Sequence, residues 1–268
     1  MEKFKISVVT VVYNSENEIE QTIKSVIRQD YANKEYIVID GGSTDGTVDI
    51  INKYLNNINY FISEKDHGIY DAMNKAIQYA SGTWINFMNS GDQFIADNVL
   101  SNIHFDKLSK YDVIFGDQVI RRFGTLYVSE AKPLYESPYC KHSMGFNHQC
   151  CFVKRSCTIK YPFDLRYKLA ADYDMIMKIF RNGGFFLHVS LPIAYFDLNG
   201  VSSLNQAKHR KEVLMIDGER GFSLFFQIVC YRLELLFRKY VSIVLCHFFP
   251  TIKKERTIKN LIEYKGAL

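Results

Sequence analysis

Short apolar segments alternate with helical segments through the first hundred residues, and this alternation limits the fold more than any other feature of the chain. Segments with the length and composition of buried strands occur at residues 6–12, 36–39, 60–62 and 84–88. Between them, apolar residues recur at helical spacing, first after the capping-box pattern Ser15-Glu16-Asn17-Glu18. The order strand, helix, strand predicts an α/β fold with a mostly parallel, doubly wound central sheet flanked by helices.

The second of these strands ends at a carboxylate that is followed by a glycine turn. Asp40 closes the strand, Gly41 and Gly42 permit a sharp turn, and Thr44 or Asp45 can cap the next helix. Open α/β sheets bind ligands at the carboxyl ends of their strands, so Asp40 is interpreted as an acceptor for a ribose or a base. An ordinary strand, turn and cap is the alternative. The glycine spacing is not Gly-x-Gly-x-x-Gly, which disfavours a dinucleotide-dependent oxidoreductase.

The strand and helix pattern loosens beyond the fourth strand. A fifth strand is predicted at residues 113–115, and residues 121–162 read as short strands and loops that hold three of the five prolines. A helix over residues 171–182 stops at Gly183-Gly184, and two short strands follow near 186–189 and 193–196. From Gln206 the chain reads as helix to its end.

The net charge of +4 comes entirely from the end of the chain. Residues 219–268 carry nine Lys and Arg against four Glu, whereas residues 1–218 carry 24 basic and 25 acidic side chains. A nearly neutral body gives no support for nucleic-acid binding, and none is expected. A basic tail with nine Phe and Tyr residues predicts contact with an anionic membrane surface.

Two further acidic groups stand at positions where chemistry is possible. Asp92, in Asn89-Ser90-Gly91-Asp92, follows the strand at 84–88 and so lies on the same edge of the sheet as Asp40. A carboxylate there can hold Mg²⁺ or Mn²⁺ together with phosphate and water, although the same residues are also common in plain turns. Asp172 and Asp174 begin the helix at 171–182, either as a catalytic base or as dipole-stabilising acids, and at most one can point into a given pocket.

The order of these motifs along the chain is typical of one protein family. Residues 9–14, the Asp40 turn, residues 68–76, residues 89–92, His148-Gln149 and residues 172–174 follow one another as they do in family 2 glycosyltransferases. The chain resembles that family over roughly residues 4 to 203, and in particular bacterial transferases of capsule, O-antigen and colanic-acid type. The resemblance implies a GT-A fold, which is a Rossmann-like fold. It also implies a nucleoside-diphosphate sugar donor, a divalent metal and inversion at the anomeric carbon.

The resemblance also assigns roles to residues of this chain. Asp172 would be the catalytic base and Asp92 the ligand of Mg²⁺ or Mn²⁺. Many relatives have Asp-x-Asp-Asp where this chain has Asn89-Ser90-Gly91-Asp92, so two of three carboxylates are missing. The remaining assignments are donor binding by Tyr13, Asp40, Asp66, Asn74, Asn89 and Asp92, and acceptor binding or support by His148, Gln149 and Asp174.

The expected function is transfer of a sugar, with a UDP-sugar as the preferred donor, to a hydroxyl of a glycan or lipid-linked acceptor in surface-polysaccharide biosynthesis. Residues 1–218 would form the GT-A domain, with a donor half at 1–100 and an acceptor half at 101–218. A non-catalytic scaffold with the same fold is the alternative. Without a charged leader and apolar stretch at its start, the chain is expected in the cytoplasm, peripheral on the inner face of the membrane.

The tail at 219–268 is expected to lie on the membrane and not to cross it. Its apolar stretch at 222–249 is interrupted by Arg232, Glu234, Arg238 and Lys239, so no uncharged run long enough to span a bilayer exists. A basic, aromatic-rich helix pair in the membrane interface is the favoured interpretation. The alternative is a helix pair packed on the body or on a second subunit.

Overall fold

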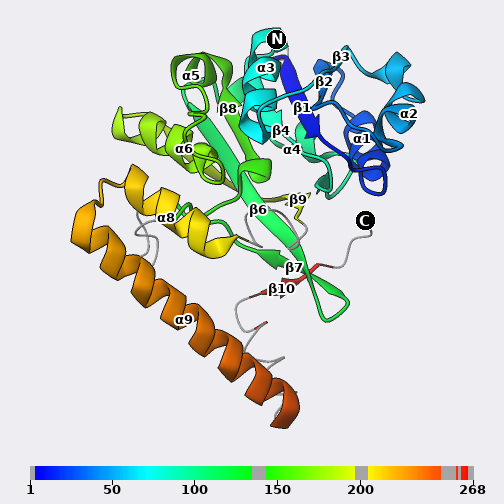
Figure 1. The fold of residues 1–268 in the computed structure, drawn as a ribbon. Coiled ribbons are helices and arrows are strands. Elements are labelled where there is room, and N and C mark those ends of the chain that lie inside the picture. Colours follow the sequence, from blue (N-terminus) through cyan, green and yellow to red (C-terminus); the bar gives the residue numbers. More distant parts are fainter. Residues whose placement is uncertain (1–3, 135–142, 197–204, 249–257, 259–260, 265–268) are drawn as a thin grey trace.

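The structure is a computed structural model, and it describes residues 4–134, 143–196, 205–248, 258 and 261–264. A curled central sheet runs through the body with helices on both of its faces, and a long helix extends from the body near the end of the chain (Figure 1). The strands follow the order β10-β7-β6-β8-β4-β1-β2-β3, and β9 pairs with both β5 and β6. The predicted α/β class is confirmed.

The first half of the sheet is parallel, as predicted. It consists of β1 (Ile6–Val12), β2 (Lys34–Asp40), β3 (Tyr60–Ser63) and β4 (Trp84–Phe87). All three pairings among these strands are parallel, and the register places Val12 opposite Asp40. The carboxyl ends of the four strands therefore meet at one edge, which is the edge that carries Asp40 and the loop after β4.

The first three helices are α1 (Ile19–Ile27), α2 (Thr47–Asn52) and α3 (Ile69–Tyr79), and the one-turn helix η1 (Leu55–Asn57) follows α2. The predicted capping box before α1 does not form. The Ser15 hydroxyl donates to the Glu18 carboxylate at 2.8 Å, whereas a capping box requires each side chain to bond the other's backbone N–H. Glu18 is itself the N-cap position, so the helix begins at Ile19, later than the pattern predicts.

The second half of the sheet is mixed. It comprises β5 (Gln93–Phe94), β6 (Val113–Arg122), β7 (Thr125–Ser129), β8 (Cys151–Lys154) and β9 (Phe186–Tyr195). The predicted strand at 113–115 is only the beginning of β6, which turns back as the hairpin partner β7. The two short strands predicted near 186–196 are one strand, because register shifts in its pairing with β6 let it continue past Asp117.

Short helices close the connections of this half. They are α4 (Val99–Asn102), η2 (Phe105–Lys107), η4 (His148–Cys150), α5 (Arg155–Lys160) and α6 (Ala171–Arg181). Gly183 ends α6 with a φ of 79°, a left-handed conformation that glycine adopts without strain, so the predicted stop is confirmed. The core lies on both sheet faces: Val8 of β1 packs with Trp84 and Phe152, and Val9 packs with Met73 and Phe115 on the other face.

The end of the chain contains α8 (Gln206–Ile216), α9 (Gly221–Phe248) and β10 (Ile262–Glu263). The expectation of helix to the end of the chain was therefore wrong. β10 pairs antiparallel with β7, and the Tyr264 N–H donates to the Leu126 carbonyl at 2.9 Å, which satisfies an edge that β7 would otherwise leave open. Within the described residues, no helix combines the length and the apolar content that crossing a bilayer requires.

Candidate active site

Two loops at the carboxyl edge of the sheet are joined by hydrogen bonds between their backbones and short polar side chains. Asn14, which has a positive φ of 46°, receives the Thr44 N–H at 2.8 Å on its side-chain oxygen and donates its own N–H to Ser43 Oγ at 2.7 Å. Glu16 accepts the Gly46 N–H at 2.9 Å. The loop after β1 and the loop after β2 are therefore fixed to each other.

Asp40 is fully buried at the start of the second of these loops, and both of its carboxylate oxygens accept hydrogen bonds. Oδ1 accepts from the Ser43 hydroxyl at 2.5 Å, and Oδ2 accepts the N–H groups of Gly42 and Ser43 and the hydroxyl of Ser63, between 2.6 and 3.0 Å. Gly42 has a φ of 82°, which explains the glycine. Asp40 thus orders the turn that follows β2. Tyr13, at the same edge, is 61% exposed.

Asp66 and Asn74 are both tied to backbone groups. Asp66 Oδ1 accepts the Gly68 N–H at 2.8 Å just before α3, and its carboxylate lies so close over Gly41 that a Cβ there would meet Oδ2 at 2.5 Å. Asp66 is thus brought beside the Asp40 turn. Asn74 donates to the Phe163 carbonyl at 2.8 Å and accepts the Phe163 N–H at 3.0 Å. Its amide therefore holds α3 to the segment before α6.

The loop that carries Asp92 is anchored to α1. Thr22 Oγ1 donates to the Asp92 carbonyl at 2.7 Å and accepts the Gly91 N–H at 3.1 Å, and the Ser90 hydroxyl donates to the Ser15 hydroxyl at 2.8 Å. Asp92 is 7% exposed, and its Oδ2 accepts the Gln149 side-chain N–H at 2.8 Å. Sequence reasoning missed Thr22, because a threonine among the buried positions of a helix carries no distinguishing signal.

His148 connects this loop to α6. Its Nε2 lies 3.1 Å from Asn89 Nδ2, and its Nδ1 lies 3.2 Å from Asp172 Oδ2. The Nδ1 side of the His148 ring therefore faces Asp172, and its Nε2 side faces the Asn89 amide. The hydroxyl of Tyr70 donates to Asp172 Oδ1 at 3.0 Å. Sequence reasoning also missed Tyr70, which lies within the 68–76 motif but was given no role.

The electrostatics of this cluster keep Asp172 ionised. Burial raises the pKa of the Asp172 carboxyl. The hydrogen bond with His148 and the charge of that histidine lower it by more than burial raises it, so the pKa falls below its ordinary value. Burial lowers the pKa of His148, yet the hydrogen bond and charge of Asp172 and the charge of Asp92 raise it overall. Burial, followed by the Asp172 charge, raises the pKa of Tyr70 well above its usual range, so Tyr70 remains a donor. Asp172 can therefore accept a proton at neutral pH.

Asp174 points away from this cluster. Its carboxylate lies 2.6 Å from Lys178 Nζ one turn along α6. Asp172 and Asp174 therefore project from different sides of the helix, as their spacing predicts. The structure brings together Asn89, His148 and Asp172, and separately Asp92 and Gln149, while Asp174 stays with Lys178.

The groups around Asp92 fit a hard divalent cation. Asn89 Oδ1 and Gln149 Oε1 are buried oxygens without a hydrogen-bond partner among the described residues, and Asn89 and Gln149 belong to the loop and the short helix that meet at Asp92. Oxygen ligands of this kind suit Mg²⁺ or Mn²⁺. The described residues contain no group of three or more His, Cys, Asp or Glu side chains that could hold a metal by themselves. An ion at this place would need further oxygen ligands besides those of Asp92, Asn89 and Gln149.

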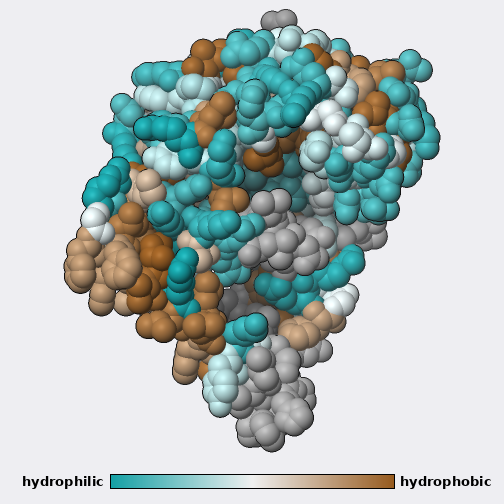
Figure 2. Space-filling model, viewed as in Figure 1, coloured by the Kyte–Doolittle hydropathy of each residue, from teal (hydrophilic) through white to brown (hydrophobic). Residues whose placement is uncertain are grey.

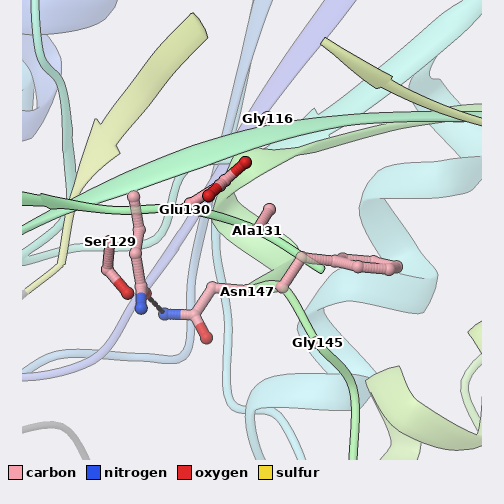
Figure 3. Close-up of a pocket in the computed structure, with 8 residues that line it drawn as sticks. Gly116, Ser129, Glu130, Ala131, Gly145 and Asn147 are labelled. Atoms are coloured by element: carbon pink, nitrogen blue, oxygen red, sulfur yellow. Dashed lines mark hydrogen bonds between the residues drawn. The ribbon is translucent and has the colours of Figure 1, made fainter. Parts of the chain in front are cut away.

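A small polar pocket is lined in part by the residues that directly precede His148 in the sequence. It has a volume of about 40 Å³ and lies between β6, β7 and the residues just before His148 (Figure 3). The Asn147 amide donates to Gln118 Oε1 at 2.5 Å across it. Its lining is formed by Gly116, Gln118, Ser129, Glu130, Ala131, Gly145, Phe146 and Asn147. The pocket belongs to the half of the chain in which the sequence predicts acceptor binding.

Solved structures with the same fold are glycosyltransferases. The Staphylococcus aureus TarS fragment 1–349 in complex with UDP-GlcNAc superposes with a TM-score of 0.64 at 21% identity, over 79% of this chain and 65% of that chain. Glucosyl-3-phosphoglycerate synthase from Mycobacterium tuberculosis, solved with Mn²⁺, UDP and its product, gives a TM-score of 0.58 at 19% identity, over 82% of both chains. The fold is therefore the GT-A fold.

Curated relatives agree in sequence. A PGL/p-HBAD biosynthesis glycosyltransferase of Mycobacterium bovis is 28% identical over 77% of this chain and 82% of its own length. The Escherichia coli enzyme WfgD, a UDP-Glc:α-D-GlcNAc-diphosphoundecaprenol β-1,3-glucosyltransferase, is 28% identical over 68% of this chain and 72% of its own. The family model "Glycosyl transferase family 2" matches residues 7–156, which include the Asp40 turn, the Asp92 loop and His148-Gln149. With its fold, these relatives and this match, the chain belongs to glycosyl transferase family 2.

Proposed function

We propose that this glycosyltransferase is an inverting enzyme in which Asp172 is the catalytic base. The observation that carries the proposal is the position of Asp172, which contacts both His148 and Tyr70, while the same His148 contacts Asn89 of the Asp92 loop. His148 thus contacts both the proposed base, Asp172, and the loop that carries the proposed metal ligand, Asp92. The side chain of Asp172 is 15% exposed, so a substrate can reach it.

The proposed reaction is a single displacement. Asp172 accepts the proton of an acceptor hydroxyl while that oxygen bonds to the anomeric carbon and the bond from this carbon to the diphosphate oxygen breaks. Attack opposite to the leaving group inverts the anomeric configuration. Mg²⁺ or Mn²⁺ held at Asp92 would supply positive charge to the departing diphosphate. The ordered Asp40 turn, with Tyr13 and Asp66 beside it, is proposed to receive the nucleoside.

The proposed donor is a UDP-sugar, and the proposed acceptor is a lipid-linked glycan of a surface-polysaccharide pathway. The donor is supported by neighbours of the same fold that were solved with UDP or UDP-GlcNAc. The acceptor is supported by WfgD, whose own acceptor is a diphosphoundecaprenol-linked sugar. Such an acceptor would bring the enzyme to the inner face of the cytoplasmic membrane, a proposal that is supported by the basic segment 219–268.

A panel of nucleotide sugars tests the proposal. The full chain, incubated with each donor and Mn²⁺, is expected to hydrolyse one or a few of them slowly, and EDTA is expected to abolish that hydrolysis. Asp172→Asn should remove transfer to an added acceptor without lowering the melting temperature substantially. If no donor is hydrolysed or bound with Mn²⁺ while the chain remains folded, the scaffold function replaces the catalytic one.

A further inference from the structure

Helix α9 carries apolar side chains on two opposite faces. One face is half-buried against the body: Leu224, Ile228, Tyr231 and Leu235 lie on it, and the Arg210 guanidinium of α8 sits 5.7 Å from the centre of the Tyr231 ring. The other face, here called the outer face, points away from α8. Its members are Phe222, Phe225, Phe226, Val229, Leu233, Leu236, Phe237 and Tyr240, with exposed fractions from 37% for Val229 to 80% for Phe222.

The outer face is continuous along the helix. Phe222, Phe226, Val229, Leu233, Leu236 and Tyr240 follow one another at spacings of four and three residues, so they form one stripe with Phe225 and Phe237 beside it. At 1.5 Å per residue this stripe is about 27 Å long. Figure 2 shows hydrophobic surface over α9, below a body whose visible surface is mainly hydrophilic. A patch of this extent marks an interaction site.

The charges next to the outer face are mainly positive. Arg232 and Lys239 are seven residues apart and therefore lie on one side of the stripe. Glu234, the one acid of the helix, forms an ion pair with Arg238 one turn along. In sequence, Lys253, Lys254, Arg256 and Lys259 follow closely. An aromatic stripe bordered by cations matches the composition of helices that lie in the interface of an anionic bilayer.

We propose that the outer face of α9 binds the surface of an anionic phospholipid bilayer, with the helix lying parallel to the membrane plane. The aromatic and leucine side chains would enter the boundary between headgroups and acyl chains, and Arg232 and Lys239 would reach the lipid phosphates. A second copy of the chain fits less well, because pairing two outer faces would bring like charges together. The proposal rests on the proposed function, because a lipid-linked acceptor lies in the membrane to which α9 would bind.

Vesicle sedimentation tests the proposal without donor or acceptor, so its failure is distinguishable from failure of the proposed function. The full chain is mixed with vesicles of phosphatidylcholine containing phosphatidylglycerol, and with vesicles of phosphatidylcholine alone. The variant Leu233→Glu/Phe237→Glu places two charges on the outer face. The matched control is Phe185→Glu, which replaces an aromatic side chain that is 64% exposed outside α9.

Wild type and Phe185→Glu are expected to bind the anionic vesicles at least tenfold more tightly than Leu233→Glu/Phe237→Glu does, and more tightly than they bind neutral vesicles. Arg232→Glu/Lys239→Glu should weaken binding to the anionic vesicles. Melting temperatures equal to that of the wild type would show that the variants are folded. The proposal is overturned if Leu233→Glu/Phe237→Glu binds anionic vesicles as tightly as wild type does. It is also overturned if wild type does not bind vesicles and light scattering shows a dimer that Leu233→Glu/Phe237→Glu dissociates.

Discussion

Nδ1 of His148 lies 3.2 Å from Oδ2 of Asp172, and this contact lowers the pKa of the Asp172 carboxyl despite its burial. An ionised carboxylate can accept a proton, and Asp172 is the proposed base for a substrate hydroxyl. The same imidazole contacts Asn89 on its other nitrogen, so the α6 helix and the loop after β4 are held in a fixed relation.

The first prediction concerns Asp172. Asp172→Asn should lower the turnover number for sugar transfer by roughly 10²- to 10⁴-fold, the usual contribution of a general base, with little change in donor affinity. Asp174→Asn is the matched control, because it makes the same chemical change two residues away at a carboxylate that pairs with Lys178. Steady-state kinetics of transfer measure both. An equal loss in the two variants would contradict the assignment of Asp172 as base.

The second prediction concerns the support of Asp92. Gln149 donates to the Asp92 carboxylate at 2.8 Å and is 4% exposed, so Gln149→Leu should release that carboxylate and weaken Mn²⁺-dependent UDP binding by about 10- to 100-fold. Titration calorimetry with UDP, with and without Mn²⁺, gives the affinity. Asp97→Asn, at an exposed carboxylate paired with Arg28, should leave it unchanged. Metal-dependent affinity that survives Gln149→Leu would show that Gln149 does not position the ligand.

The third prediction separates the structural part of Asp40 from its proposed part in binding. Asp40→Ala leaves two backbone N–H groups and two hydroxyls without their acceptor, and it should lower the free energy of unfolding by about 3 kcal/mol. Urea unfolding measures the change. Asp49→Ala, at an exposed position of α2, should cost less than about 0.5 kcal/mol. A loss for Asp40→Ala no larger than this control would mean that the turn does not depend on the carboxylate.

The fourth prediction is a pH dependence of stability that comes from Glu35. Burial raises the pKa of Glu35, but hydrogen bonds from Lys5, Ser7 and Ser81 outweigh it and lower the pKa from 4.5 to about 2. A lowered folded pKa stabilises the protein above the unfolded value, and this stabilisation is lost as the pH falls from 4.5 towards 2. Glu35→Gln should therefore cost about 3 kcal/mol at neutral pH.

Urea unfolding of wild type and Glu35→Gln at several pH values measures this effect. The difference between the two proteins should shrink as the pH falls below 4.5 and approach zero near 2. Asp97→Asn breaks an ion pair whose partners are both more than half exposed, so its effect should stay within about 1 kcal/mol. A constant difference between wild type and Glu35→Gln across this range would show that the Glu35 carboxyl is not held ionised by its neighbours.

The parallel half of the fold could be predicted because burial on both faces requires runs of apolar residues. Every residue of β1 is buried, and the sequence of residues 6–12 is accordingly dominated by Ile and Val. The β10 strand could not be predicted in this way. It is two residues long and both are exposed, so its formation depends on the open edge of β7, which lies far away in sequence.

The candidate residues could be named one by one from the sequence, but the network of contacts among them could not. Asp40, Asp92 and Asp172 were selected because each stands at the end of a strand or the start of a helix, where ligands bind or where dipoles favour acids. The contacts of His148 with Asn89 and of Tyr70 with Asp172 join residues 59 and 102 positions apart. Sequence periodicity contains no information on such contacts, since they arise only when the two halves of the sheet close on each other.

The hydrogen bonds between Asn14, Ser43 and Thr44, and between Thr22 and the Asp92 loop, are made by groups of the chain itself. The backbone of the edge that would hold a nucleotide sugar has therefore already lost most of its conformational freedom on folding. Binding then costs little additional entropy at these loops, and the association rate should be limited by diffusion and desolvation, without a slow closing step on this side of the sheet.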